Sequence, residues 1–152
     1  MEKLSDSDFL YLLKISPLIS IDFIVKDSNN QVLLGYRTNE PAKNNWFVPG
    51  GRIFKNETIN QAFYRLAKDE LGIDSRCIEP SFHGVFEHLY HNSFYSSEVT
   101  THYIVLAYVI QVDLNISQLP KGQHSNYRWF SIPELMDSPT VNVYTKKYFE
   151  EN

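Results

Sequence analysis

The pattern of hydrophobic and polar positions divides this chain into strands and helices. Several short apolar segments are rich in β-branched and aromatic residues and are bounded by turn residues, which is typical of strands. The expected strands are Leu18–Val25, Val32–Tyr36, a short extended piece at Trp46–Val48, Ser81–Tyr90, Tyr103–Val112 and Tyr127–Ser131. Both faces of Tyr103–Val112 are apolar, so we expect a central strand that is covered on both sides.

Helical patterns lie between and after these strands. The expected helices are Phe9–Ile15 with Ser7 or Asp8 as its cap, the long helix Thr58–Leu71 that stops at Gly72, Ile132–Met136 with Ser131 as its cap, and Tyr144–Glu151. A chain of 152 residues with no repeat or linker has the length of one domain, so we expect a single domain over residues 1–152. The order of the elements predicts an α/β sandwich with a mixed sheet.

The long helix places a carboxylate at the end of an apolar face. At about 100° per residue, one stripe of this helix is formed by Ile59, Phe63, Leu66 and Glu70. A carboxylate in such a position needs a partner, because burying an unpaired charge is costly, and a divalent metal ion is the obvious one. The alternative is an ordinary amphipathic helix whose Glu70 reaches out to solvent.

A glycine pair precedes this helix. Gly50 and Gly51 let the backbone approach a charged ligand closely, and the start of the helix adds free N–H groups and a positive dipole end. Arg52 stands directly beside the pair, which favours a contact with phosphate, and further arginines and carboxylates recur along the helix. This arrangement is typical of a binding site for a metal-bound pyrophosphate and indicates a nucleotide-cleaving enzyme.

The spacing from Gly51 onward resembles the Nudix box, G-x5-E-x7-R-E-U-x-E-E-x-G-U, where U is a bulky apolar residue. The positions that match are Gly51, Glu57, Arg65, Glu70, Gly72 and Ile73, with Asp69 as a conservative variant. The clear departure is Leu66, which replaces a Glu that is usually a metal ligand in the family, or near one. We therefore infer fewer metal ligands and one ion rather than two or three.

Residues outside the box make the chain similar to one particular subfamily. They are Asp22, Arg37, Glu87-His88, Thr101-His102-Tyr103, Gln123-His124 and Tyr127-Arg128-Trp129. Together with Leu66, they make the chain similar to the GDP-mannose mannosyl hydrolases of the Nudix superfamily, from about Phe9 to Phe149. The resemblance implies an α/β/α sandwich with a mixed sheet, a nucleotide-sugar substrate, a homodimer, and one Mg²⁺ per subunit for which Mn²⁺ can substitute.

The same resemblance implies roles for single residues. It makes Gly50, Glu70 and Gln123 the metal ligands, His124 the general base, Arg37 and Tyr103 the groups that assist the leaving diphosphate, and His88 a residue on the sugar side. Two assignments stay open. Arg65 either holds phosphate or braces the box by pairing with Glu57. Asp22 either faces the sugar, holding its hydroxyls or stabilising a cationic transition state, or points to water at a strand edge. By themselves, Gln123 and His124 read as polar loop residues.

Composition narrows the classes of partner. The formal charge of −4 argues against general nucleic-acid binding, which requires a basic surface. Cys77 is the one cysteine, so no internal disulfide is possible; this favours a reducing cytoplasm, with Cys77 as a small buried hydrophobic residue. No signal peptide or membrane span is visible. The spacing of His83, His88, His91 and His102 fits no common zinc pattern, and we expect all of these but His88 to be structural or surface residues.

Three functions are consistent with these patterns. The first is hydrolysis of a GDP-hexose at the anomeric carbon, which gives GDP and a sugar of inverted configuration. The second is a standard Nudix pyrophosphatase that directs water at phosphorus. The third is a nucleotide-binding module without catalysis. No residue visibly selects among mannose, glucose and fucose.

Overall fold

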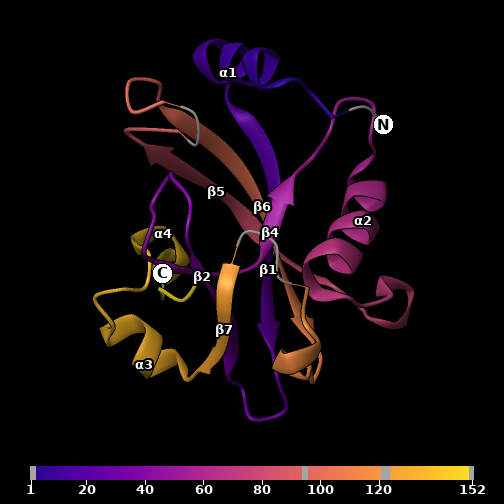
Figure 1. Cartoon of the computed structure of the whole chain (residues 1–152). Coiled ribbons are helices and arrows are strands. Elements are labelled where there is room, and N and C mark those ends of the chain that lie inside the picture. The colour runs from indigo at the N-terminus through magenta and orange to yellow at the C-terminus, as the bar shows by residue number, and fades with distance from the viewer. Residues whose placement is uncertain (1–2, 94–95, 121–123, 151–152) are drawn as a thin grey trace.

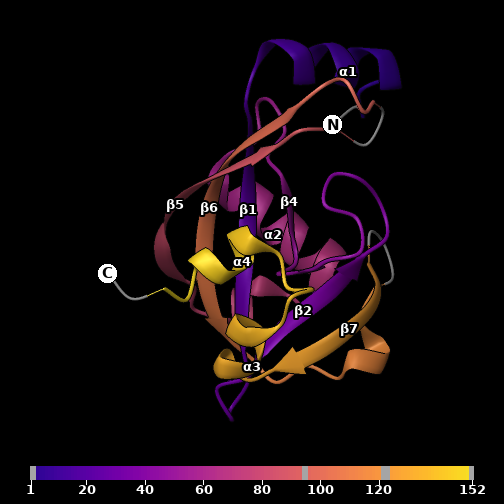
Figure 2. The same ribbon diagram turned by 90° about the vertical axis from the view of Figure 1, so that its left-hand side faces the viewer.

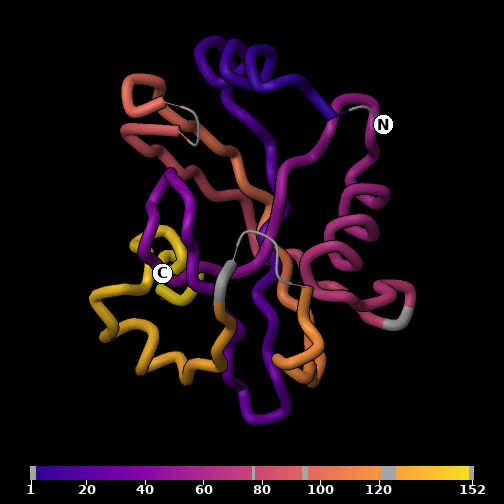
Figure 3. Tube along the Cα trace, viewed as in Figure 1, coloured from indigo at the N-terminus to yellow at the C-terminus, as the bar shows by residue number. Residues whose placement is uncertain are grey.

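The computed structural model describes residues 3–93, 96–120 and 124–150, except for the side chains of Cys77, His124 and Ser125. Its path can be followed from indigo to yellow in Figure 3. The helices are α1 (Asp6–Ile15), α2 (Ile59–Leu71), α3 (Ile132–Asp137) and α4 (Val143–Lys147), with short 3-10 turns η1 (Ser75–Cys77) and η2 (Ile116–Gln118). The strands are β1 (Leu18–Lys26), β2 (Val32–Arg37), β3 (Trp46–Phe47), β4 (Gly50–Arg52), β5 (Ser81–Tyr90), β6 (Thr101–Gln111) and β7 (His124–Phe130).

The described strands form one seven-stranded mixed sheet. Its main order is β3-β2-β1-β6-β5; β4 pairs with β1, and β7 pairs with β2. β1 pairs with β6 in parallel along the whole of β1, whereas every other strand pair is antiparallel. The expectation that β6 is a central strand is confirmed, because it lies between β1 and β5.

Helices cover both faces of this sheet. In Figures 1 and 2, α2 lies on one face, α3 and α4 lie on the other, and α1 crosses the end of the sheet. Alternate residues of β1 divide between two cores: Phe23 packs in the cluster that includes Leu66 of α2, and Ile24 packs in the cluster that includes Leu135 of α3. The expected α/β/α sandwich is therefore confirmed. No helix in the described ranges has both the length and the apolar character to cross a bilayer.

Both ends of α2 are fixed by local chemistry. Thr58 and Gln61 form a capping box, in which each side chain accepts a hydrogen bond from the other residue's backbone N–H. At the other end, Gly72 takes φ 67°, and its N–H bonds back to the last turn. The predicted helix and its glycine stop are confirmed.

Three local predictions were wrong, and one strand was not predicted. The N-cap of α1 is Ser5, whose hydroxyl accepts from the Asp8 N–H, so the helix starts earlier than expected. The strand β4 was missed because two glycines carry no strand pattern. Helix α4 ends at Lys147, short of the predicted end. Ile59, expected on the apolar stripe of α2, is 47% exposed.

Candidate active site

A cavity of about 480 Å³ opens between α1, α2 and the sheet. Its walls come from segments far apart in sequence, because strands β1, β2, β4, β5 and β6 all reach it. The expected site residues on its wall are Asp22, Arg37, Gly50, Arg52, Arg65, Glu70, His88 and Tyr103. Of the residues named from sequence, Gln123 lies outside the described residues, and only the backbone of His124 is described. Across the β2–β7 pair the Cα of His124 lies opposite Arg37, beside this cavity.

The glycine pair is required by close packing. On β4, Gly50 lies opposite Asp22 of β1, and a Cβ at Gly50 would overlap the Ile21 carbonyl oxygen and Oδ1 of Asp22. A Cβ at Gly51 would overlap Cδ2 of Leu66. The residue that departs from the Nudix pattern therefore fills the space beneath the glycine backbone.

Glu57 and Arg65 bind each other. Arg65 Nε donates to Glu57 Oε1 at 2.6 Å, and Nη2 donates to Glu57 Oε2 at 3.1 Å and to the Arg52 carbonyl at 2.8 Å. Glu57 Oε2 also accepts from the Phe54 N–H at 2.9 Å. The hydrogen bond from Arg65 holds the pKa of the Glu57 carboxyl below its usual range. The geometry thus favours the bracing role of Arg65. Both oxygens of the Glu57 carboxylate are occupied by hydrogen bonds within the protein.

Two further arginines are held in fixed positions. Arg52 lies between two rings, with its guanidinium carbon 5.1 Å from the Phe9 centroid and 4.9 Å from that of Phe54. Arg37 donates through Nε to the Asn39 carbonyl at 2.9 Å. Burial lowers the pKa of both arginines. Arginines that are already oriented on the cavity wall suit the binding of phosphate oxygens.

Glu70 has the character of a metal ligand. Burial, and then the charge of Asp69, raises the pKa of its carboxyl to about 7. No described residue donates a hydrogen bond to it, so a cation would supply the missing partner. Within the described part of the chain, no group of three or more His, Cys, Asp or Glu is placed to share a metal ion. Of the described groups, the Glu70 carboxylate and backbone oxygens such as the Gly50 carbonyl are hard oxygen donors that could hold a cation such as Mg²⁺.

Asp22 lies on a central strand, and its half-buried side chain lines the cavity. It pairs with Ala107 of β6 on one side and with Gly50 on the other, so the alternative of a strand-edge carboxylate in water was wrong. Burial raises the pKa of Asp22 to about 7, against the opposing effects of a hydrogen bond from Tyr148 and the charge of Arg37.

Tyr148 was not expected at the site. Its hydroxyl donates to Asp22 Oδ2 at 2.5 Å and lies 3.1 Å from His88 Nε2. The His88 ring is buried and stacks on Tyr144, with 4.7 Å between the ring centroids. Burial lowers the pKa of His88 to about 4, so its ring is neutral at physiological pH. The only sequence signal for Tyr148 was its place on one helical face with Tyr144.

Two of the remaining histidines named from sequence, His83 and His102, contact other residues of the protein. His83 Nε2 lies 2.7 Å from the Tyr148 carbonyl oxygen, and His102 Nε2 lies 3.2 Å from Glu87 Oε2. His91 is exposed.

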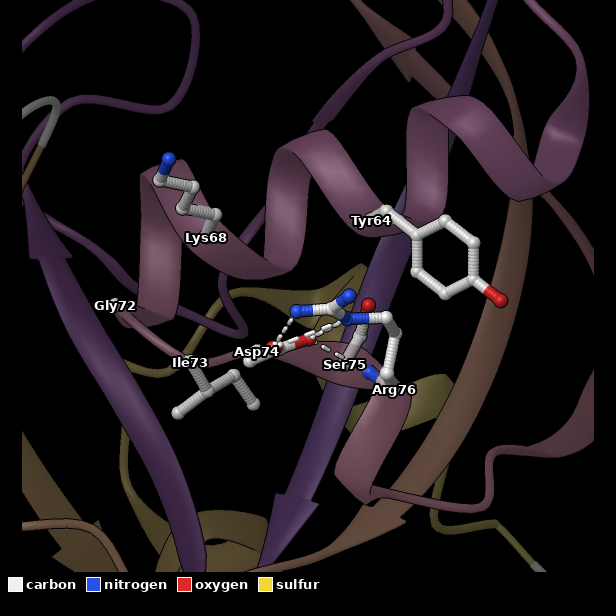
Figure 4. Close-up of a pocket in the computed structure, with 7 residues that line it drawn as sticks. All are labelled: Tyr64, Lys68, Gly72, Ile73, Asp74, Ser75 and Arg76. Carbon is white, nitrogen blue, oxygen red and sulfur yellow. Dashed lines mark hydrogen bonds and ion pairs between the residues drawn. The ribbon is translucent and has the colours of Figure 1, made fainter.

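A second hollow, of about 470 Å³, lies at the C-terminal end of α2 and contains none of the expected site residues. Figure 4 shows Arg76 folded back onto Asp74, and the two side chains form an exposed ion pair at 2.6 Å. This pairing satisfies the charges of both residues. The first cavity is therefore the candidate active site.

Comparison with known proteins agrees with this geometry. The model of the NUDIX domain matches residues 17–151. The low-salt glycan biosynthesis protein Agl8 of Haloferax volcanii is 38% identical over 142 residues, which is 93% of this chain and 88% of that protein.

Two solved structures share the fold. The MutT protein of Methanosarcina mazei Go1 superposes with a TM-score of 0.69 at 19% identity, over 89% of this chain and 92% of that one. The NUDIX domain of Shewanella oneidensis NrtR, crystallised with ADP ribose, gives a TM-score of 0.65 at 15% identity, over 96% of both chains. With its box, its sandwich and these matches, the chain belongs to the Nudix hydrolase family.

Proposed function

We propose that this protein hydrolyses a GDP-hexose such as GDP-mannose to GDP and free sugar, with water attacking the anomeric carbon. One observation carries this choice. Of the acidic positions of the box, Glu70 alone is an uncommitted carboxylate on the cavity wall: Glu57 is bound to Arg65, position 66 is a buried leucine, and Asp69 is exposed and outside the cavity lining. Attack at phosphorus in this family commonly relies on several carboxylates and metal ions. A site with one such carboxylate suits a reaction in which the diphosphate only has to leave.

Each side of the cavity would serve one part of the substrate. Arg37, Arg52 and Tyr103 would hold the diphosphate oxygens, and Arg65 would keep the end of β4, which carries Arg52, in place. Asp22 and His88 would face the sugar from β1 and β5. When bound at Glu70, the Gly50 carbonyl and Gln123, Mg²⁺ would neutralise negative charge on the leaving group; Mn²⁺ could take its place.

The reaction needs one base and no strong general acid. The bond between the water oxygen and the anomeric carbon forms while the bond from that carbon to the diphosphate oxygen breaks, and its electron pair leaves with GDP. His124 would accept the water proton, since an imidazole titrates near neutral pH. Attack from the face opposite the leaving group inverts the anomeric carbon, as in inverting glycosidases. Asp22 would stabilise positive charge that develops on the sugar.

The comparisons favour a substrate of this class. The relative from Haloferax volcanii is named for glycan biosynthesis, and the NrtR domain was crystallised with ADP ribose, a nucleotide joined to a sugar. Both names concern those proteins, and they support a nucleotide sugar here only by similarity.

Isotope labelling separates this reaction from its main competitor. Turnover of GDP-mannose in ¹⁸O-water with Mg²⁺ should place the label in the sugar, and proton NMR should show mannose of inverted configuration as the first product. Label in phosphate, with GMP and mannose 1-phosphate as products, would instead establish a standard Nudix pyrophosphatase. Tight Mg²⁺-dependent binding of GDP-mannose without turnover would establish a binding module.

We also propose that the protein is a homodimer. The edge strand β5 exposes Phe82, Val85 and Leu89 by 56%, 61% and 53% of their surfaces. An exposed apolar strand at a sheet edge favours association with another chain. Sedimentation equilibrium should give twice the monomer mass; a monomer at micromolar concentration would contradict this proposal.

A further inference from the structure

Tyr148 is a buried polar residue that the proposed reaction does not use. It directly follows α4 and is 3% exposed, and it lies behind Asp22 and His88 rather than on the cavity wall. Its hydroxyl touches both of these cavity residues, one on β1 and one on β5. A hydroxyl buried between two functional side chains decides which atoms of those side chains remain available to a ligand.

The strand β5 fixes Tyr148 at its backbone as well as at its hydroxyl. His83 contacts the Tyr148 carbonyl oxygen at 2.7 Å, while His88 contacts the hydroxyl at 3.1 Å. The rings of Tyr148 and Phe86 also form a T-shaped pair, with 4.7 Å between the centroids. Tyr148 is therefore held at three points and has little freedom to turn away from Asp22.

A bulge in β5 allows both His83 and His88 to contact Tyr148. His83 and His88 are an odd number of residues apart, so in a regular strand they would face opposite sides of the sheet. The register of β5 against β6 shifts between Phe82 and Gly84, and Gly84 takes φ 149°, a conformation that favours glycine. The extra residue brings His83 to the same face as His88, where α4 lies.

The protons of this cluster can be assigned by counting donors. A tyrosine hydroxyl has one proton to donate. Tyr148 donates its proton to Asp22 Oδ2, so towards His88 it can act only as an acceptor. The neighbouring His88 Nε2 must then carry a proton. Because the His88 ring is buried and neutral, its Nδ1 carries none.

We propose that Tyr148 is a positioning residue that holds Asp22 by Oδ2 and fixes His88 in the Nε2–H form, which leaves Asp22 Oδ1 and His88 Nδ1 as hydrogen-bond acceptors. Two acceptors select a ligand that donates, and adjacent sugar hydroxyls are donors of that kind. The assignment to a sugar rests on the proposed function. The hydrogen-bond order itself does not, since it follows from contacts within the protein.

The first test reads the tautomer directly. Two-bond ¹H–¹⁵N NMR of the histidine rings in the wild-type protein should show His88 protonated at Nε2. The resonance is assigned by its loss in His88→Gln. A ring protonated at Nδ1 would overturn the proposal, whether or not the protein turns over GDP-mannose.

The second test uses a matched pair of variants. Tyr148→Phe keeps the ring and its contact with Phe86 but removes the hydroxyl, whereas Tyr144→Phe removes a hydroxyl that donates to the Leu89 carbonyl instead. Tyr148→Phe should give a mixture of His88 tautomers and lower kcat about 10-fold or more, with KM and inhibition by GDP changed less than about 2-fold. Tyr144→Phe should change none of these.

The outcomes separate the two proposals. Normal kcat and an unchanged His88 spectrum in folded Tyr148→Phe would overturn the positioning role. A wild-type protein that shows the Nε2–H form but produces no GDP from GDP-mannose would contradict the proposed function and leave the hydrogen-bond order standing. If Tyr148→Phe does not fold, the wild-type tautomer still decides the inference.

Discussion

Leu66 packs against Gly51 so closely that a Cβ at position 51 would overlap Cδ2 of the leucine. Leu66 is 2% exposed, so its side chain has little room to move aside. Position 66, where the Nudix pattern has a carboxylate, is thus a packing position in this chain. The contact joins the long helix to the glycine strand that carries the expected ligand Gly50.

This contact predicts coupled effects on stability. Gly51→Ala should lower the free energy of unfolding by about 1–2 kcal/mol, because Leu66 must shift in a filled core. In a Leu66→Ala background the same change should cost less, and urea unfolding of the four proteins in this cycle measures the coupling. Gly50→Ala is the control: it would overlap the Ile21 carbonyl, so Leu66→Ala should not relieve it. Additive costs at Gly51 and Leu66 would contradict the close contact.

The pair of Arg65 and Glu57 should be important for stability. Its carboxylate side chain is 1% exposed, so Arg65→Gln would leave a buried charge without its partner. We expect a loss of about 2–4 kcal/mol in urea unfolding. Arg76→Gln breaks the exposed pair with Asp74 and should leave the melting temperature unchanged. Equal effects of the two variants would show that burial of the first pair does not matter.

Glu70→Gln should remove the response to metal. In the wild-type protein, Mg²⁺ should raise the melting temperature, because an ion that binds only the folded state stabilises it. The variant should lose most of this shift and should need far more Mg²⁺ for turnover. The exposed neighbour Asp69 provides the control, and Asp69→Asn should keep the shift. A full Mg²⁺ response in Glu70→Gln would remove Glu70 from the ligand set.

Asp22 should make stability depend on pH in a defined direction. The folded protein holds the pKa of this carboxyl at about 7, above the unfolded value of 3.8, so the folded state binds more protons between these values. The contribution of Asp22 is complete below about pH 4 and is lost as the pH rises through about 7.

Asn at this position cannot ionise but can still accept from Tyr148. Relative to wild type, Asp22→Asn should therefore gain stability as the pH rises from about 4 to about 8, by at most about 4 kcal/mol. Urea unfolding at several pH values measures this difference. A difference that does not change with pH would contradict the raised pKa.

His124→Gln tests the proposed base. Turnover should fall roughly 10²–10⁴-fold while the affinity for GDP-mannose changes little, since the variant keeps a polar side chain but cannot take up the proton. Rapid-quench kinetics and equilibrium dialysis separate the two quantities. Normal turnover would place the base elsewhere in the cavity.

Local sequence was enough where the determining contacts are local. The strand periodicity of β1, β5 and β6, the helix α2 and its stop at Gly72 depend on neighbours within a few residues, and each was found close to where it was expected. The resemblance to the Nudix box gave the pairing of Arg65 with Glu57 as one of two choices, and the structure contains this pair. β4 escaped detection because its glycines form a strand only by pairing with β1.

The sequence by itself predicted the order of strands and helices, the α/β sandwich, and a glycine pair ahead of a helix that places Glu70 at the end of an apolar face, because these depend on residue type and spacing. The resemblance to the Nudix family supplied the roles of most other candidate residues. Only the tertiary structure decided which of those residues share a cavity, that Asp22 lines that cavity, and that Tyr148 joins Asp22 to His88. Those relationships depend on the pairing of β1 with β4 and β6 and on α4 packing against β5. The hydrogen bond from Tyr148 to Asp22 joins residues 126 positions apart, and local sequence patterns do not indicate contacts over such distances.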